Sequence, residues 1–534
     1  MTYDRRKFIK QSALAAGGIS LLGGATFSCT TQPAALAGTL HGPSVNYGHL
    51  LRQAIAQKVS HTKKIDTVIV GGGVSGLSAA KKLKEQGIDF SLLELEPVTG
   101  GNARSANIQG QNCPWGAHYL PLPSAEMPEL IAFLEEIGVV TGRDANALPQ
   151  YKEDYLTFAP QERLFRQGFW QKGLVPSWEI PTEDQQEINR FIEETDEWRY
   201  KKGKDGKYAF ALPVAHSSSD EAIRALDNIS MQAWLKQQGY KSEYLNWYVN
   251  YSCRDDYGSN LKNTSAWAGL HYFCSRRYSG EQEGVLTWPE GNAWLVNRLK
   301  QQVEEHCAVN SLVFKVEPLI AGVAIHYLNT DTKEVTRIEA QNCIMAIPQF
   351  VAAHLLPARQ NLLHDFIYTP WLTANIALKH EPQFHGQSLC WDNVIYNSNS
   401  LGYVHANHQE LETIHSSPVI TYYEPLSELQ PAEARKWLLN ADYANLQQRI
   451  YAELKVAHPA IHEQSRQCDI WRWGHGMISP QPGFIWGESR MLASEPLEDK
   501  ILFAHTDLGG VSVFEEAFYQ GLNAANLILK ERRV

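Results

Sequence analysis

The sequence predicts an α/β fold in which a Rossmann-type domain is combined with a second domain. Two observations predict it. The chain of 534 residues is too long for one compact core, so two interleaved or sequential domains are expected. Near its start, residues 67–94 read as strand, glycine loop, helix and strand, which is the unit from which parallel sheets are built.

The glycine loop follows a buried strand and opens a helix. Residues 67–70 (TVIV) form a β-branched run that is typical of a buried parallel strand. Apolar residues at helical spacing continue from the loop to Gly87, and residues 90–93 predict the next strand. The loop matches G-x-G-x-x-G, and its residues expected to contact phosphate are Gly71, Gly73, Val74, Ser75 and Gly76.

A dinucleotide is the ligand that this arrangement favours over a merely flexible turn. The glycines allow a tight turn, close approach of the backbone to a pyrophosphate, and close packing of helix on strand. The start of the helix offers free N–H groups and a partial positive charge. Glu94, at the end of the second strand, is placed to accept hydrogen bonds from ribose hydroxyls.

A second glycine pair identifies the dinucleotide. Gly100 and Gly101 follow Glu94 after a five-residue gap, and Asn102 and Arg104 come next. This pattern resembles the flavin amine oxidase superfamily, which includes phytoene-type desaturases and in which an acid, such a gap and GGR form a second FAD pyrophosphate loop. The resemblance implies FAD. Asn102 stands where the family has arginine, and Arg104 lies two places later, which puts the role of the arginine in doubt.

Three later segments carry the same resemblance. Residues 501–507 and 514–525 resemble the closing motif of the family, in which an acid binds the flavin ribitol; Asp507 is the matching acid. Residues 308–313 resemble the strand that meets the adenine, with Val313 in that place. Residues 342–348 resemble a strand that ends in A-x-P.

The resemblance implies an FAD-binding domain of the amine oxidase type (GR2-like), interleaved with an α+β substrate domain. The expected segments are a signal at 1–37, a linker at 38–62, the FAD-binding domain at 63–125, 280–350 and 471–534, and the substrate domain at 126–279 and 351–470.

The resemblance also places candidate residues beside the flavin ring. Gly116, Ala117, His118 and Tyr119 are expected to touch the isoalloxazine or its ribitol. The candidate catalytic residues are His118, Tyr119, His475 and Phe514. An imidazole there could act as a base or stabilise reduced flavin, and a structural histidine bonded to backbone is the alternative. Phe514 matches a tyrosine of the aromatic cage of monoamine oxidases and keeps the wall without the phenol dipole.

Other candidates have structural alternatives of equal or greater weight. His475 and Trp473 fall where the family lines its cavity, although packing is the more common role for such residues. Arg254 followed by Asp255 and Asp256 is read first as an ion pair; an unpaired carboxylate of this group could instead bind a cationic amine.

The family lysine that holds a water near flavin N5 has no counterpart, because its place falls in residues 373–376 (TANI) and Lys379 is out of register. This absence puts rapid use of oxygen in doubt and affects a dehydrogenase less. Two short segments, 42–52 and 287–293, look similar to bacterial spermidine dehydrogenases.

Charge and cysteine usage exclude several classes of protein. The formal net charge of −10 argues against binding to nucleic acid, which requires a basic face, and does not exclude a cationic substrate. The eight cysteines are scattered without zinc or haem spacing, so no metal site is expected.

The N-terminus resembles a twin-arginine export signal. Arg5 and Arg6 precede Lys7-Phe8-Ile9-Lys10 and a short stretch rich in alanine and glycine. A periplasmic protein cleaved after residues 35–37 is expected, with a lipoprotein acylated at Cys29 as the alternative.

These observations together favour an exported FAD-dependent oxidoreductase that moves hydride from an amine or polyamine to flavin N5, with an acceptor that the sequence leaves unknown. A desaturase or isomerase for an apolar, isoprenoid-like substrate and a non-catalytic flavin-binding surface protein are the alternatives.

Overall fold

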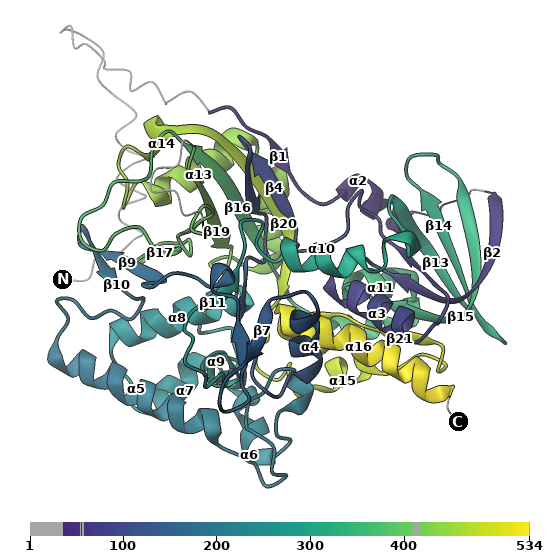
Figure 1. The fold of residues 1–534 in the computed structure, drawn as a ribbon, viewed down its shortest axis with the longest axis horizontal. Coiled ribbons are helices and arrows are strands. Elements are labelled where there is room, and N and C mark those ends of the chain that lie inside the picture. Colours follow the sequence, from purple (N-terminus) through teal and green to yellow (C-terminus); the bar gives the residue numbers. More distant parts are fainter. Residues whose placement is uncertain (1–35, 54, 56–57, 410–416, 533–534) are drawn as a thin grey trace, which may run out of the picture. The chain divides into compact units, whose positions relative to one another are not determined.

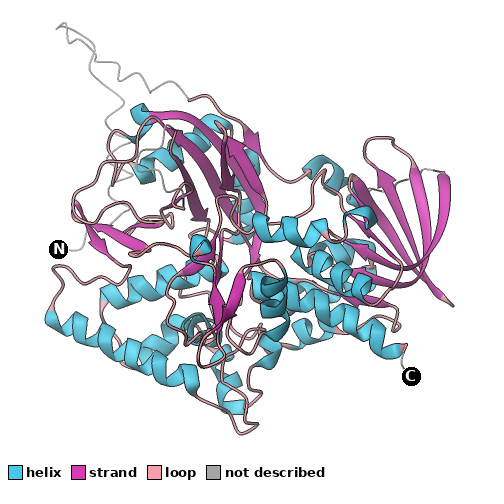
Figure 2. Ribbon diagram, viewed as in Figure 1, coloured by secondary structure: helices cyan, strands magenta, loops and turns pink. Residues whose placement is uncertain are grey.

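The computed structural model describes residues 36–53, 55, 58–409 and 417–532. The twin arginines and Cys29, which carry the predicted signal and lipid anchor, lie outside the described residues. Two large sheets, each with its own helices, make up the described chain (Figures 1 and 2).

The first sheet is built around the predicted strand–loop–helix–strand unit. Its central strands run parallel, because β2 pairs with β3 on one side and with β15 on the other. Its strands are β12 (Cys307–Ala308), β3 (Phe90–Leu93), β2 (Val59–Val70), β15 (Val335–Met345), β14 (Gly322–Asn329) and β13 (Ser311–Leu319), with β21 (Ile501–Phe503) also beside β15. The β2 strand begins well before the predicted residue 67, because it follows the long β15 as its partner.

The helices α3 (Val74–Glu85), α10 (Ala293–Gln301) and α16 (Phe514–Glu531) lie on this side of the chain's fold, with α3 and α16 packed against the sheet. The α3 helix packs against both others, and the Ser78 hydroxyl donates to the carbonyl of Phe518 across the α3–α16 contact. The closing helix of the chain is thereby brought beside the first glycine loop (Figure 1).

The second sheet has eight strands. In spatial order they are β1 (Leu40–His41), β20 (Ser465–Ile478), β16 (Tyr368–Leu378), β19 (Val419–Pro425), β18 (Tyr403–His405), β17 (Asp392–Ile395), β9 (Glu162–Arg166) and β10 (Phe169–Lys172). The predicted domain boundary at residue 471 falls inside β20, and the predicted linker at 38–62 contains β1 and the start of β2.

Alternation along β16 separates the two faces of the second sheet. Leu372, Ala374 and Ile376 belong to a core shared with α12 (Pro431–Asn440) and α13 (Tyr443–Leu454). Trp371 instead joins a cluster rich in aromatic rings that includes Tyr251 of α8 (Glu243–Tyr257). One face is therefore closed by helices, and the other presents aromatic side chains.

The helices α5 to α9 gather together, as Figure 2 shows in cyan below the second sheet. They are α5 (Thr182–Tyr200), α6 (Glu221–Arg224), α7 (Met231–Gln237), α8 (Glu243–Tyr257) and α9 (Ala266–Cys274). Ser230, Ser242 and Ser265 each accept a backbone N–H at the start of a helix, which fixes where α7, α8 and α9 begin.

Smaller elements complete the described chain. They are the paired strands β4 (Ser105–Ile108) with β5 (Gln111–Pro114), β6 (Tyr119–Pro121) with β11 (Val285–Thr287) and β7 (Val140–Arg143) with β8 (Pro149–Tyr151), and the helices α2 (Val45–Gly48), α4 (Pro128–Glu136), α11 (Gln349–Leu355), α14 (Ile461–Gln464) and α15 (Glu488–Ser494). No helix of the described ranges has the length and apolar character needed to cross a membrane.

Candidate active site

A cavity of about 440 Å³ is lined by residues of the second sheet, of α8 and of the start of α16. Its wall includes the predicted flavin-side residues Gly116 to Tyr119 and Phe514, together with rings from the aromatic face of the second sheet. The glycine loops lie beside this cavity rather than in its wall, so the predicted cofactor residues divide into a phosphate-binding part and a flavin part.

The two glycine loops are in direct contact. Gly100 N–H donates to the carbonyl of Gly72 at 2.8 Å. Gly71 has a φ of +105°, and a Cβ there would lie 2.3 Å from the carbonyl oxygen of Ala346. A Cβ on Gly76 would lie 1.9 Å from the carbonyl oxygen of Gly71. Only glycine fits these positions, so the turn keeps the backbone open to a ligand.

The start of α3 is free to bind an anion. Gly73 is its N-cap residue and supplies no side-chain hydrogen bond, so the first N–H groups of the helix, in the turn that holds Val74 and Ser75, are uncapped. Gly101 lies against Gly73. The two loops thus frame a helix N-terminus of the kind that holds a pyrophosphate.

Glu94 ends β3 as predicted and is buried. One carboxylate oxygen accepts the N–H of Gly72 at 2.6 Å, and the other accepts the N–H of Glu96 at 2.9 Å. Each oxygen keeps a lone pair for a ribose hydroxyl. Burial raises the pKa of Glu94, whereas the two backbone hydrogen bonds lower it.

Asn102 and Arg104 occupy different surroundings. Asn102 lines the cavity and donates its amide to the carbonyl of Gly476 at 2.6 Å. Arg104 lies 3.3 Å from the Glu96 carboxylate and against the ring of Trp471. The sequence left the role of this arginine open, and the structure gives Arg104 a partner two residues beyond Glu94.

Val313 lies on β13, opposite Tyr327 of β14 and directly before an irregularity in the strand pairing. The same strand starts at Ser311, whose N–H donates to the carbonyl of Glu94 at 2.8 Å. The predicted adenine-side strand is therefore attached to the predicted ribose acid.

Asp507 has an unused acceptor. Its Oδ2 accepts the N–H of Gln349 at 2.8 Å and the hydroxyl of Tyr368 at 2.6 Å. Its buried Oδ1 accepts no hydrogen bond within the described ranges, although His505 Nδ1 lies 3.0 Å away. Burial raises the pKa of Asp507, but the neighbouring His505 and these hydrogen bonds outweigh it and lower the pKa, which leaves an anionic acceptor for a ribitol hydroxyl. The residues present therefore fit FAD.

The loop before β6 presents its backbone to the cavity. A Cβ on Gly116 would lie 2.2 Å from the carbonyl oxygen of Asn102, and Ala117 is exposed into the cavity. His118 stacks on Tyr423 with ring centroids 4.4 Å apart, and its Nδ1 lies 3.4 Å from the carbonyl oxygen of Gly116. Burial lowers the pKa of His118 to about 4, so the ring is neutral at pH 7 and is a weak base.

The start of α16 closes another part of the cavity. Val513 and Phe514 both line it, and no side chain caps the helix. The partial positive charge of this helix end therefore faces the space beside the predicted flavin loop.

His475 differs from the expectation because it does not line the cavity. Its ring stacks on Phe350 with centroids 4.0 Å apart and meets the edge of Tyr368. The pairing of β20 with β16 is irregular here, since Trp473 pairs with Trp371 but Met477 pairs with Thr369, and the extra residues turn His475 away. Trp473 does line the cavity and donates its indole N–H to the carbonyl of Trp115 at 3.0 Å.

The cavity wall holds more acid than the sequence predicted. The carboxylates that line it are Glu162, Asp255, Asp256, Asp392 and Glu515. Arg276 is the cation among the residues that line it, and it lies 3.4 Å from Asp256 and 3.3 Å from Glu515. The other three carboxylates form no ion pair in the described part of the chain.

These three carboxylates are held by phenols and burial. Asp255 accepts the hydroxyl of Tyr119 at 3.1 Å, and Asp392 accepts that of Tyr251 at 3.2 Å. Burial, with the neighbouring acid Asp256, raises the pKa of Asp255 to about 7. Burial and nearby acids raise the pKa of Asp392, and burial alone raises that of Glu162.

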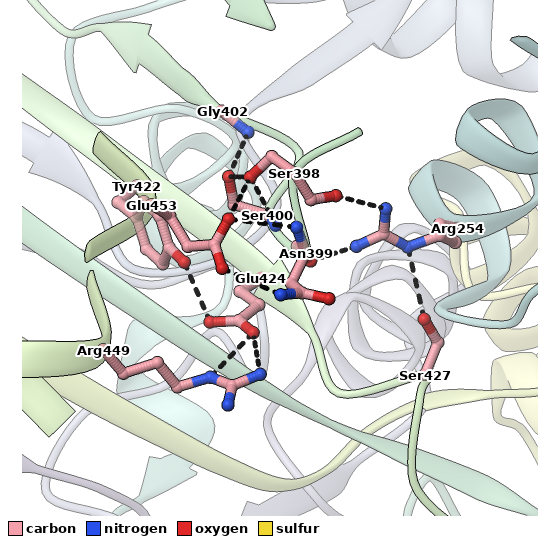
Figure 3. A network of polar contacts seen from close by, with 10 residues as sticks. All are labelled: Arg254, Ser398, Asn399, Ser400, Gly402, Tyr422, Glu424, Ser427, Arg449 and Glu453. Carbon is pink, nitrogen blue, oxygen red and sulfur yellow. Dashed lines mark hydrogen bonds and ion pairs between the residues drawn. The ribbon is translucent and has the colours of Figure 1, made fainter. Parts of the chain in front are cut away.

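Arg254 is not the partner of Asp255 or Asp256, contrary to the first interpretation of this cluster. Figure 3 shows its guanidinium directed at the carbonyls of Ser398 and Asn399 and at the hydroxyl of Ser427. These residues lie on segments that follow β17 and β19. Arg254 therefore fixes α8, which carries Asp255, against the strands that carry the rest of the wall.

The predicted absence of a lysine is matched by the lining of the cavity. Thr373 occupies the corresponding part of β16 and donates its hydroxyl to the carbonyl of Trp115 at 2.9 Å. Lys379 lies past the end of β16 and donates to the carbonyl of Glu463. No lysine is among the described residues that line the cavity.

Sequence reasoning missed Glu162, Arg276, Asp392 and Glu515. They come from β9, β17, the start of α16 and the segment after α9, so no spacing connects them. The one available signal was an acid inside an apolar, aromatic run, as at Asp392 between Trp391 and Val394.

Comparison with known proteins agrees with this geometry. A family model described as flavin containing amine oxidoreductase matches residues 74–529. AofH of Mycobacterium tuberculosis, named as a flavin-containing monoamine oxidase, is 23% identical over 296 residues, which are 53% of this chain and 57% of that relative. The oxidoreductase PigB of a Serratia species is 23% identical, with 87% of this chain and 75% of PigB covered.

Solved structures of amine oxidases share the fold. Putrescine oxidase bound to putrescine superposes with a TM-score of 0.62 at 18% identity, covering 88% of this chain and all of that chain (100%). Cyclohexylamine oxidase of Brevibacterium oxydans gives a TM-score of 0.61 at 14% identity, covering 88% of this chain and 100% of that chain. With the family match over most of its length, the chain belongs to the flavin-containing amine oxidoreductase family, whose cofactor, FAD, its residues fit.

Proposed function

We propose that the chain is an exported FAD-dependent oxidoreductase that oxidises a diamine or polyamine by hydride transfer to flavin N5. The observation that carries the substrate class is the set of three carboxylates, Glu162, Asp255 and Asp392, that face the cavity and form no ion pair with any described residue. An amine with more than one positive charge would satisfy such a wall, whereas an apolar substrate would leave it unpaired.

The energetics favour a cation in this cavity. Removing carboxylates from water costs free energy, and their raised pKa values express that cost. A bound ammonium group offsets it through charge-assisted hydrogen bonds. The rings of Trp391 and Tyr423 line the same space and can add cation–π attraction.

The residues divide the chemical work between them. FAD, when bound, would supply the acceptor for the hydride of the substrate C–H bond, which carries both electrons. With a pKa of about 7, Asp255 can accept the ammonium proton that must leave before oxidation. Neutral His118 and the ring of Phe514 orient the amine, and water then hydrolyses the imine product. The start of α16 directs a partial positive charge at this space.

Anaerobic reduction of the flavin absorption band tests the proposal. Diamines and polyamines should bleach the band, and an isoprenoid should leave it unchanged. Bleaching by the isoprenoid alone would establish the desaturase or isomerase alternative. Bleaching by dithionite and by no organic substrate would establish a non-catalytic flavin protein.

The electron acceptor is proposed to be a molecule other than oxygen, since residues 373–376 fall in the place of the family lysine and no lysine is among the described residues that line the cavity. Amine-reduced enzyme mixed with a quinone or phenazine dye should reoxidise much faster than with dissolved oxygen. Reoxidation by oxygen at an equal or greater rate would contradict this part of the proposal.

Export by the twin-arginine route is supported by Arg5, Arg6 and the short apolar stretch that follows. Replacing both arginines with lysine should leave the protein in the cytoplasmic fraction. A periplasmic protein should be released in water-soluble form by osmotic shock. If the protein instead stays with the membrane and Cys29→Ser releases it, the lipid anchor would be established.

A further inference from the structure

Residues 39–52 form a segment, here called the strap, that lies outside the region matched by the family model. It contains β1, α2 and η1 (His49–Arg52). In Figure 1 it is the purple ribbon that leaves β1 beside β20 and continues to α2. The strap contacts both sheets.

Its first end is fixed to the second sheet. Leu40 and His41 pair in parallel with Ile470 and Trp471 of β20. The N–H and the hydroxyl of Thr39 both donate to one oxygen of Asp469, at 2.8 and 2.9 Å.

Its other end is fixed to the FAD-binding sheet. Ser44 donates its N–H to one carboxylate oxygen of Glu96 at 2.8 Å and its hydroxyl to the other at 3.1 Å. Leu50 and Leu51 then pack beside the cluster of Leu312 and Leu328 from β13 and β14. The strap thus bridges the two sheets.

The strap contacts residues that neighbour the predicted FAD site. Glu96, held by Ser44, lies two residues beyond the ribose acid Glu94. The His41 ring lies 5.2 Å from that of Trp115, the residue before the flavin-side Gly116.

At its far end, η1 packs against α11, whose first residue, Gln349, donates its N–H to Asp507. Burial is the largest cause of the lowered pKa of His475. The positive charges of Arg435 and Arg52 lower this pKa further, whereas Asp507 raises it. The end of the strap is therefore connected through α11 to the predicted ribitol acid.

We propose that the strap is a latch that retains FAD, and that the cofactor leaves only after the strap has detached from Glu96. This inference rests on FAD as the cofactor and is independent of the substrate. Release through such a latch depends on the small fraction of molecules in which the strap is open. Weakening either attachment raises that fraction and speeds release by the same factor.

The test measures the rate of flavin release from the holoenzyme by flavin fluorescence after dilution. Ser44→Ala should release FAD roughly tenfold faster, because it removes one hydrogen bond to a charged group. Ser219→Ala is the matched control. Ser219 likewise donates its N–H at 2.8 Å and its hydroxyl at 3.1 Å to one carboxylate, that of Asp205, in a contact remote from the strap.

Thr39→Ala extends the test to the opposite end of the strap. It leaves the contact between Ser44 and Glu96 in place and should also speed release, since both ends hold one latch. Unchanged release in Ser44→Ala, equal acceleration in Ser219→Ala, or an effect of Ser44→Ala without one of Thr39→Ala would each overturn the inference.

Discussion

Asp255 is the residue on which the proposed chemistry depends most. It lies on α8, receives the hydroxyl of Tyr119, and has a pKa of about 7 because it is buried beside Asp256. A carboxyl with this pKa exchanges its proton near neutral pH, as a group that accepts a proton from an ammonium must.

The pH dependence of turnover follows from this pKa. Below about pH 7 Asp255 is neutral and attracts a cation weakly, and above it the carboxylate binds the cation and accepts its proton. For a diamine, kcat/KM should therefore rise with pH through about 7. Asp255→Asn should lower kcat/KM by roughly 100-fold, the usual size of a general-base contribution, and remove this limb of the profile. If kcat/KM of Asp255→Asn still rose with pH through about 7, another titrating group would be responsible for that rise.

The same shift affects stability in a defined direction. The pKa of Asp255 is raised from 3.8 in the unfolded chain to about 7 in the folded chain. Its contribution to the unfolding free energy is therefore fully present below pH 3.8 and is lost as the pH rises through 7. At pH 8, with no substrate present, Asp255→Asn should unfold at a higher temperature than the original protein. At pH 5 the difference in thermal midpoint should shrink, and a constant difference would contradict the assigned pKa.

Gly76 tests the phosphate-binding turn at the scale of one atom. A Cβ would lie 1.9 Å from the carbonyl oxygen of Gly71, so Gly76→Ala must displace the loop. The variant should be purified with little or no flavin, as judged from the ratio of flavin to protein absorbance. Gly87→Ala, at the other end of α3, has no atom within 4 Å of the new Cβ. Gly87→Ala should keep its flavin. Its free energy of unfolding should fall by only about 1 kcal/mol, because alanine is disfavoured in the left-handed backbone conformation.

At the scale of elements, Arg254 sets the position of α8. Its hydrogen bonds to Ser427 and to the carbonyls of Ser398 and Asn399 connect the helix to the strands opposite it (Figure 3). Glu453 holds the same segment from the other side through Ser398 and Asn399. The cavity between α8 and these strands therefore depends on this network.

Arg254→Ala should cost about 3 kcal/mol of unfolding free energy, because the carbonyls of Ser398 and Asn399 and the hydroxyl of Ser427 lose a buried donor. It should also raise KM for a diamine, since α8 carries Asp255. Denaturant unfolding and steady-state kinetics measure the two effects. Arg143→Ala, which removes an exposed ion pair with Glu135, is the control and should change neither. A normal KM in a destabilised Arg254→Ala would limit the role of Arg254 to folding.

Local elements were predictable from sequence and their distant partners were not. The β2–α3–β3 unit and the closing α16 follow from spacing within a few residues, and both are found where predicted. The assignment of Arg254 to its sequence neighbours was wrong, because its partners lie more than a hundred residues away. The orientation of His475 depends on the irregular pairing of two strands, which no periodicity reveals.

At the scale of the whole molecule, the cofactor site and the substrate cavity differ in how far the sequence predicts them. The FAD-binding sheet carries its motifs in contiguous segments, so the cofactor could be inferred from sequence. The substrate cavity is assembled from β9, β17, α8 and α16, and its acidic wall exists only in the folded chain. The net charge of −10 is consistent with a cationic ligand but did not locate it.

The central claim is that the acidic wall selects amines with more than one charge. The most direct test is anaerobic stopped-flow reduction of the flavin by a diamine and by the monoamine of equal chain length, in the original protein and in Asp392→Asn. The diamine should bind at least tenfold more tightly than the monoamine, and Asp392→Asn should remove most of that difference while leaving the monoamine unaffected. Equal affinity for the two amines, or a preference that survives Asp392→Asn together with Glu162→Gln, would contradict the account.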